Sequence, residues 1–290
     1  MSRLGVALLW TLHWLPLAVQ AMLGNGLGLL LYYAAGKRRQ IGAINIGLCF
    51  PDRTMQERRR LLRRHFQVTT RAAIEHGLLW WSGAERIERL VRMEGLEHFQ
   101  AAYGKPLVLL APHFIGLDMG GIRISTEYHP LVSMYSRLKN PIFDRLMLHA
   151  RTRFGQSVLI SRHEGVRPLI REMKSGLPLY YLPDQDFGAK DAVFAPFFGV
   201  PAATVNALPR LAKVAQAAVI PAITRQLPGG RGYVVKFYPP WDNFPSDDLT
   251  ADVTRMNAFI EARVREMPEQ YFWLHKRFKT RPTGEAKFYP

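Results

Sequence analysis

The sequence of 290 residues contains a single cysteine, Cys49, and an internal disulfide framework is therefore excluded. This scarcity fits a reducing compartment. We interpret Cys49 as a small buried hydrophobe rather than a nucleophile, because no histidine lies near it in a motif. The chain also lacks the spacing of metal-ligating residues, so neither a metal nor another cofactor is expected.

Features that divide a chain into several domains are missing as well. We find no Ser/Gly-rich linker, no low-complexity tract and no internal repeat. We therefore predict one core, formed by residues 37–290, preceded by a membrane anchor at residues 1–36.

Charged residues are absent from residues 4–36, a length that suffices to span the ~30 Å hydrocarbon layer of a membrane. Pro16 and several glycines interrupt the segment, which would suit a kinked or obliquely inserted helix. Residues 37–39 are basic and predict that the body lies in the cytoplasm. A cleaved signal peptide is the alternative, because Val19 and Ala21 satisfy the small-residue rule, but the apolar run continues past that site.

Acidic residues are few, since 23 Asp and Glu face 39 Lys and Arg, and the net charge is +16. Such a field attracts polyanions without identifying them. Thr54 and Glu57 form a capping-box signature, and the helix that they begin carries the basic residues Arg58, Arg59, Arg60, Arg63 and Arg64. That helix suits an anionic leaflet or a phosphorylated lipid, and a solvated basic face is the alternative. Nucleic acid is not expected as a partner, because zinc-finger and RNA-recognition patterns are lacking.

A histidine follows one of the most apolar runs of the chain. Leu107–Leu110 reads as a strand buried on both faces, and His113 comes just past its end, at the sheet edge where α/β proteins place their chemistry. A neutral imidazole can take a proton from a hydroxyl if a partner fixes its tautomer. Asp118 is the nearest candidate, provided that it lies in the first turn of a following helix. The alternative is a strand-end histidine near an unrelated aspartate.

Strands and helices alternate along the rest of the chain. We expect strands at 106–111, 131–135, 157–161, 178–182, 218–223 and 232–238. Helices are expected at 116–126, 141–153, 164–174 and 249–266, with a less secure one at 203–217 because it contains Pro209. This order predicts an α/β layered fold with a largely parallel sheet flanked by helices.

Several motifs extend this pattern to a family. In order, the chain contains HFIGLD (113–118), GQSVLISR (155–162), PDQDFG (183–188) and AVIPAI (218–223). It thereby resembles the His-x4-Asp glycerolipid acyltransferase superfamily. GLCFPD (47–52), MEGLEHF (93–99) and PEQYFWLHKRFKTRP (268–282) resemble, more narrowly, the bacterial lipid A biosynthesis branch of lauroyl and myristoyl transferases. The chain departs from that branch at two positions. The branch more often carries Glu where this chain has Asp118. Its arginine before the Asn-Pro pair corresponds to Arg137, which lies one position closer to that pair in this chain.

The resemblance implies a reaction and a set of site residues. A fatty acyl chain would pass from acyl carrier protein to a hydroxyl of a lipid A precursor, an anionic phosphorylated glycolipid, on the cytoplasmic face of a Gram-negative inner membrane. His113 would act as general base, oriented by Asp118. The expected substrate contacts are Arg162, Arg137 and Lys190 for acidic groups of the acceptor, and Asp184 and Asp186, which would position the acceptor or only tie a turn.

Other functions stay open at this point. The chain could acylate another bacterial glycolipid or phospholipid with a coenzyme A donor, or could be a catalytically silent lipid-binding membrane protein. The terminal segment, which contains Trp273, Lys276 and Arg277, mixes aromatic and cationic residues and suits an interface. We interpret His275 within it as a packed or capping residue rather than a second base.

Overall fold

A mostly parallel sheet forms the centre of the computed structural model, which describes residues 2–290 except for the side chains of Ser2 and Arg162. Its strand order is β1-β9-β8-β2-β5-β3-β4. The strands are β1 (Val91–Glu94), β2 (Leu107–Leu110), β3 (Val132–Tyr135), β4 (Val158–Ser161), β5 (Leu179–Tyr181), β8 (Ala218–Gln226) and β9 (Tyr233–Phe237). Neighbours run parallel except β8 and β9, which form an antiparallel pair. The predicted fold class is confirmed.

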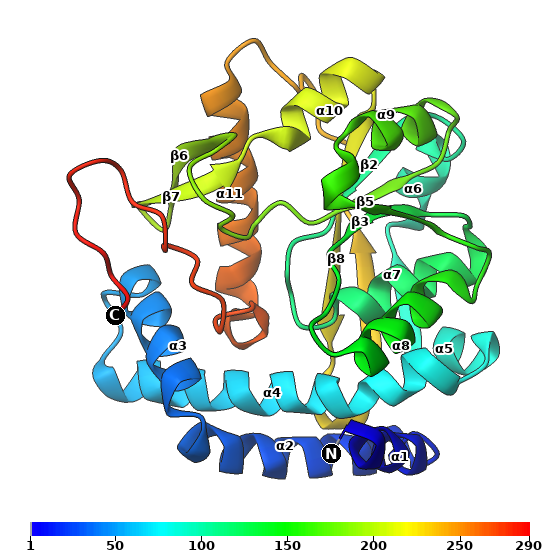
Figure 1. Ribbon diagram of the computed structural model, residues 1–290, viewed down its shortest axis with the longest axis vertical. Coiled ribbons are helices and arrows are strands. Elements are labelled where there is room, and N and C mark those ends of the chain that lie inside the picture. Colours follow the sequence, from blue (N-terminus) through cyan, green and yellow to red (C-terminus); the bar gives the residue numbers. More distant parts are fainter. Residues whose placement is uncertain (1) are drawn as a thin grey trace.

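Helices cover both faces of the sheet (Figure 1). They are α5 (Ala84–Leu90), α6 (Leu96–Ala102), α7 (Leu117–Glu127), α8 (Pro141–Thr152), α9 (Arg167–Lys174), α10 (Ala207–Ala215) and α11 (Leu249–Glu266). Val108 and Leu110 pack into one hydrophobic core, and Leu107 and Leu109 pack into a second core. Alternate side chains of one strand thus serve both faces, which explains why β2 is apolar throughout.

Two strand features differ from the expectations. β1 was not expected, and an antiparallel hairpin of β6 (Ala192–Phe197) and β7 (Val200–Val205) occupies the start of the segment expected to be helical. Phe198 and Gly199 both have positive φ, as a tight two-residue hairpin turn requires. α10 therefore begins only at Ala207, and its proline lies in the first turn, where proline is tolerated.

The N-terminal helices form a separate layer below the sheet (Figure 1). They are α1 (Ser2–Leu12), α2 (Leu17–Ala34), α3 (Gly36–Cys49) and α4 (Met55–Trp81). Pro16 separates α1 from α2, so the uncharged segment is kinked. Thr54 and Glu57 make both hydrogen bonds of the capping box that begins α4. Cys49 is buried, and burial raises the pKa of its thiol, which agrees with a packing role.

α2 packs lengthwise against α4 through glycines (Figure 1). A Cβ atom on Gly24 would lie 2.4 Å from Arg71 Cα, and one on Gly28 would lie 2.5 Å from Gln67 Cα. Only glycine permits this backbone approach. The outer face of α2 is apolar and exposed, with Met22, Leu23, Leu27, Leu30, Leu31 and Tyr33. By length and composition, α2 is the one helix in the described part of the chain that could cross a membrane.

The close packing of α2 on α4 predicts a large difference between two glycines of the same helix. Gly28→Ala should lower the melting temperature, because overpacking costs about 1–3 kcal/mol and exceeds the gain in helix propensity. Gly26→Ala is the control, because its Cβ would meet nothing within 4 Å, and it should leave stability unchanged or raise it. Thermal unfolding in neutral detergent measures both. Equal effects would contradict the packing of α2 on α4.

Candidate active site

Strand pairing brings His113 to a carboxylate. In the pairing of β2 with β5, Leu110 lies opposite Tyr181. His113 and Asp184 each follow three residues after these strand ends, so they keep the same separation of 71 residues. Parallel strands end at the same sheet edge, and neighbouring strands lie about 5 Å apart. The side chains that follow β2 and β5 therefore meet.

Asp184 holds both the ring and the backbone of His113. Its Oδ1 lies 2.7 Å from His113 Nδ1, and the backbone N–H of His113 donates to both carboxylate oxygens at 3.1 and 3.0 Å. A carboxylate only accepts, so we assign the ring proton to Nδ1. Nε2 then carries a lone pair, and it has no hydrogen-bond partner within residues 2–290 as described. The ring is thus arranged to accept a proton at Nε2.

The charge of Asp184 is retained although its side chain is only 1% exposed. Burial alone would raise the pKa of this carboxyl. The facing His113, which also donates hydrogen bonds, and the more distant Arg277 outweigh burial and leave the pKa below its ordinary value. An ionised Asp184 stabilises the imidazolium that forms when Nε2 takes up a proton.

A cavity of about 10 Å³, roughly the room of one water molecule, adjoins this pair. It is lined by His113, Asp184, Gln185, Tyr271, Phe272, His275 and Arg277. The N–H of Phe272 donates to the carbonyl of His113 at 3.1 Å, so the segment from residue 271 to 277, which we name the closing segment, covers the histidine. Arg277 is buried and donates to Ala203 O and Thr204 Oγ1, whereas its Nε has no partner in the described structure.

The closing segment is held from its C-terminal side by Asp186. The Asp186 carboxylate accepts hydrogen bonds from the Thr280 N–H at 2.6 Å and the Thr280 hydroxyl at 2.8 Å. Its own N–H donates to His275 Nε2 at 3.1 Å. Burial and the nearby His113 lower the pKa of His275 to about 4, so this acceptor stays neutral near neutral pH. Asp186 therefore ties a turn, and His275 is a packed residue as expected.

Part of the terminal segment is buried. Trp273 is fully buried, and Arg277 is nearly so. The indole N–H of Trp273 donates to Pro268 O at 2.6 Å. The aromatic residues of the segment, Trp273 and Phe278, complete the core beside α11, whereas Lys279 is exposed.

The expected partnership of His113 with Asp118 is also wrong. Asp118 does lie in the first turn of α7, but its side chain accepts a hydrogen bond from Arg151 at 2.9 Å and lies 3.6 Å from His76 Nε2. Burial opposes the charge of Asp118, and Arg151 and His76 overcome it, so the pKa is lowered. The helix turns Asp118 toward α8 and α4, whereas β5 supplies His113 with a carboxylate in register.

Two of the three basic residues expected to bind the acceptor, Arg137 and Lys190, do not line the cavity. Arg137 is exposed in the loop after β3, and Lys190 is exposed in the loop after β5. The backbone of Arg162 begins the short 3-10 turn Arg162–Glu164 directly after β4, and its side chain lies outside the description. Because β3, β4 and β5 run parallel to β2, these three basic residues come after strands that end at the same edge of the sheet as the strand before His113. Their substrate contacts stay predictions.

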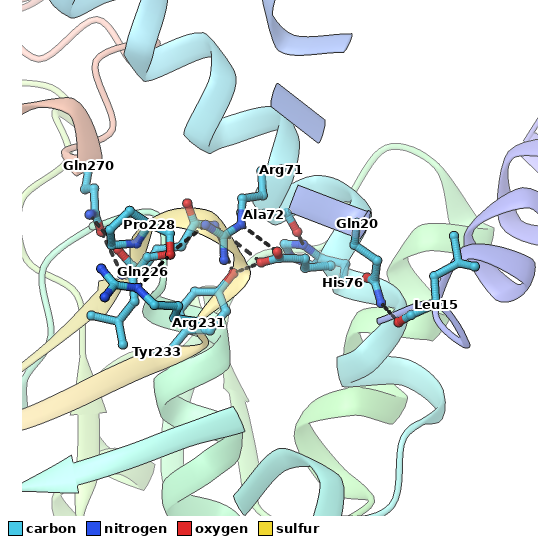
Figure 2. A network of polar contacts seen from close by, with 12 residues as sticks. Leu15, Gln20, Arg71, Ala72, His76, Gln226, Pro228, Arg231, Tyr233 and Gln270 are labelled. Carbon is cyan, nitrogen blue, oxygen red and sulfur yellow. Dashed lines mark hydrogen bonds and ion pairs between the residues drawn. The ribbon is translucent and has the colours of Figure 1, made fainter. Parts of the chain in front are cut away.

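Gln270 supports the loop that carries His113, and sequence reasoning missed it. Its carbonyl accepts the N–H of Ile115 at 2.8 Å. Its side chain bonds both backbone groups of Gln226, at 2.8 and 2.9 Å, as a neighbouring strand would (Figure 2). The end of β8 thus fixes the position of the histidine loop.

A buried polar network continues from Gln226 to the N-terminal layer (Figure 2). The Gln226 amide donates to the Tyr233 hydroxyl at 3.0 Å, and that hydroxyl donates to Glu75 on α4. Arg71 donates to Glu75 at 2.6 Å and to Leu227 O at 2.7 Å. Burial raises the pKa of Glu75 despite Arg71 beside it. The network joins α4, which packs on α2, to the edge of the site.

Comparisons with known proteins identify the family of this chain. The profile of the bacterial lipid A biosynthesis acyltransferase family matches residues 1–280. A lipid A biosynthesis lauroyltransferase of Escherichia coli is 34% identical over 100% of this chain and 94% of its own length. A lipid A biosynthesis acyltransferase of Haemophilus influenzae is 33% identical, over 97% and 88%. A myristoyltransferase of Escherichia coli is 32% identical, over 87% and 78%.

A solved structure is more distant. The match to the 1-acyl-sn-glycerophosphate acyltransferase of Thermotoga maritima covers 84% of this chain and 97% of that protein's chain, with a TM-score of 0.40 and 16% identity. The sequence relatives and the family profile define an O-acyltransferase. The chain belongs to the bacterial lipid A biosynthesis acyltransferase family.

The two carboxylates can be told apart by the pH dependence of turnover. Asp184→Asn should move the acidic limb of the pH–rate profile to lower pH and reduce kcat, because a neutral amide no longer favours the imidazolium of His113. Asp118→Asn should lower the melting temperature by removing a charged partner of Arg151, a hydrogen bond of about 1.5–3 kcal/mol, without moving that limb. A limb that moves in Asp118→Asn and stays in Asp184→Asn would assign the partnership to Asp118.

Proposed function

We propose that this protein transfers a fatty acyl chain from the thioester of acyl carrier protein to a hydroxyl of a lipid A precursor. The contact between His113 Nδ1 and Asp184 at 2.7 Å carries the proposal, because it leaves Nε2 free as a base. Nε2 takes the proton of the acceptor hydroxyl while the oxygen of that hydroxyl attacks the thioester carbonyl. The tetrahedral intermediate then collapses, and the departing thiolate receives that proton from the imidazolium.

Stabilisation of the intermediate needs a positive group near the reacting carbonyl. The backbone N–H groups of Phe114 and Ile115 already donate to Pro112 O and Gln270 O. Arg277 lines the cavity and has an unpartnered Nε, so it is our candidate for this role. Because the cavity holds only one oxygen-sized group, the closing segment has to move before both substrates can enter.

The names of the relatives support the acceptor class. They are transferases of lipid A biosynthesis, named for lauroyl and myristoyl transfer. A net charge of +16 favours an acidic carrier protein and a phosphorylated acceptor, both of which it would attract. Arg162 is our candidate for the acceptor phosphate through its fork of donors.

Replacement of the base tests this reaction. His113→Ala should lower acyl transfer by about 10²- to 10⁴-fold, because proton abstraction from the hydroxyl is lost. His149→Ala, an exposed histidine on α8, is the control and should keep the parental rate. The assay follows product by mass spectrometry with acyl carrier protein and coenzyme A thioesters side by side. Parental turnover by His113→Ala would remove His113 from the mechanism. A preference for the coenzyme A thioester would refute acyl carrier protein as the donor. Lack of turnover by the parent would favour a silent lipid-binding protein.

Membrane attachment is proposed to occur through the outer face of α2. The side chains of Met22 and Leu30 are 66% and 67% exposed there. α2 packs along α4 and is continuous with the body. The outer face of α2 would therefore lie along the membrane surface. The body would lie on the same side of the membrane as the basic residues 37–39. We place this surface on the cytoplasmic face of the inner membrane.

Attachment through this apolar face is tested by the introduction of one charge. Leu30→Asp should release the protein from vesicles, because a carboxylate resists entry into the apolar layer, while the melting temperature stays close to that of the parent. Val214→Asp makes the same change at another exposed apolar residue, 53% exposed, on α10 and should keep binding intact. Flotation with vesicles measures both variants. Undiminished flotation of Leu30→Asp would refute attachment through α2.

A further inference from the structure

A second cavity, about 570 Å³ in volume, lies where the end of α2, the start of α3 and the first turns of α4 meet. It is lined by Tyr32, Gly36, Arg39, Gln40, Ala43, Met55, Arg58, Arg59 and Leu62. It shares none of these residues with the cavity at His113. Its volume falls within the range of small-molecule sites.

The lining combines positive charge with an apolar floor. Arg39, Arg58 and Arg59 contribute charge, and no acidic residue of the described chain lines the cavity. Tyr32 and Leu62 are buried beneath it. The guanidinium carbon of Arg39 lies 5.5 Å from the centre of the Tyr32 ring. An uncompensated group of arginines is suited to an anion, and planar guanidinium groups suit phosphate oxygens in particular.

Two of the three arginines are already fixed in position. Arg39 donates to the Tyr32 carbonyl at 3.1 Å, at the C-terminal end of α2. Arg58 Nε donates to the Phe50 carbonyl at 2.9 Å. Arg59 makes no hydrogen bond or ion pair within the described residues. An anion would therefore meet two ordered cations and one that is free to close on it, which reduces the entropy lost on binding.

The surroundings indicate what carries the anion. The exposed apolar face of α2 includes Leu27 and Leu31, and Leu31 is followed directly by Tyr32, which lines the cavity. An occupant with an anionic head and an apolar chain would satisfy both surfaces. We propose that this cavity binds the phosphate of an anionic bilayer phospholipid, whose acyl chains lie along the outer face of α2. This role goes beyond acyl transfer, because it fixes the enzyme at one headgroup of the membrane.

Lipid retention tests the site without the use of a membrane surface. The full chain in neutral maltoside micelles is titrated with phosphatidylglycerol or phosphatidylcholine, and bound lipid is counted by mass spectrometry after gel filtration. The proposal predicts saturable binding of one phosphatidylglycerol per chain and far weaker binding of phosphatidylcholine. Equal retention of the two lipids would overturn it.

Matched variants distinguish a specific binding site from non-specific electrostatic attraction to the basic surface. Arg59→Gln should weaken the binding of phosphatidylglycerol by about tenfold or more, as expected for loss of one charge-assisted contact. Arg60→Gln makes the same change on α4 at a position that does not line the cavity, and it should bind nearly as the parent does. Ala43→Phe fills the cavity while it keeps every charge, and it should also lose binding.

Folding and the alternative occupant are controlled in the same series. If Ala43→Phe lowers the melting temperature, the smaller Ala43→Leu replaces it. Equal losses in Arg59→Gln and Arg60→Gln, or parental binding with a filled cavity, would show surface attraction only and overturn the proposal. Acyl transfer to detergent-dispersed acceptor should be unchanged in Arg59→Gln. A raised KM for that acceptor would assign the cavity to the substrate instead and would also refute the proposal, whereas failure of transfer in the parent concerns only the proposed reaction.

Discussion

The parallel register of β2 and β5 is the constraint on which the site depends. The same offset that pairs Leu110 with Tyr181 carries past both strand ends and sets His113 on Asp184. The backbone N–H of His113 donates to that carboxylate as well, so the ring and the loop are fixed together. A shift of either strand by one residue would turn the side chains to opposite faces and separate the pair. Core packing of both strands fixes this register and therefore keeps His113 in contact with Asp184.

Much of the fold was predictable because the central strands and the later helices have strong local patterns. β2 could be predicted from its uninterrupted apolar run, and α11 from apolar residues at helical spacing. β1 was missed because the alternation of Val91 and Met93 with the exposed Arg92 and Glu94 extends over four residues only, which is a weak signal for a strand. The β6–β7 hairpin was missed because Pro196 and Pro201, which lie opposite each other in it, argue against strands unless these are at an edge.

Only part of the site was predicted, because local sequence patterns show the position of His113 and do not show which residue contacts it. His113 could be found from its place after a strand, but its partner was sought nearby in sequence at Asp118. A signal was present, since APH after β2 and LPD after β5 end two apolar runs in the same way. Gln270 and Glu75 could not be found, because their contacts with Gln226 span 44 and 151 residues and depend on how the layers pack. Such contacts arise from tertiary structure alone.

The closing segment follows every strand of the sheet in sequence, which has a consequence for biosynthesis. A polypeptide is made from its N-terminus, so α2 is available long before Tyr271 and Phe272 exist. These residues cover His113, and Thr280, which binds the Asp186 carboxylate, comes later still. With the proposed attachment through α2, a nascent chain would reach the lipid surface while its histidine lacks this cover. The pocket at His113 would be completed only after residue 280 has been synthesised.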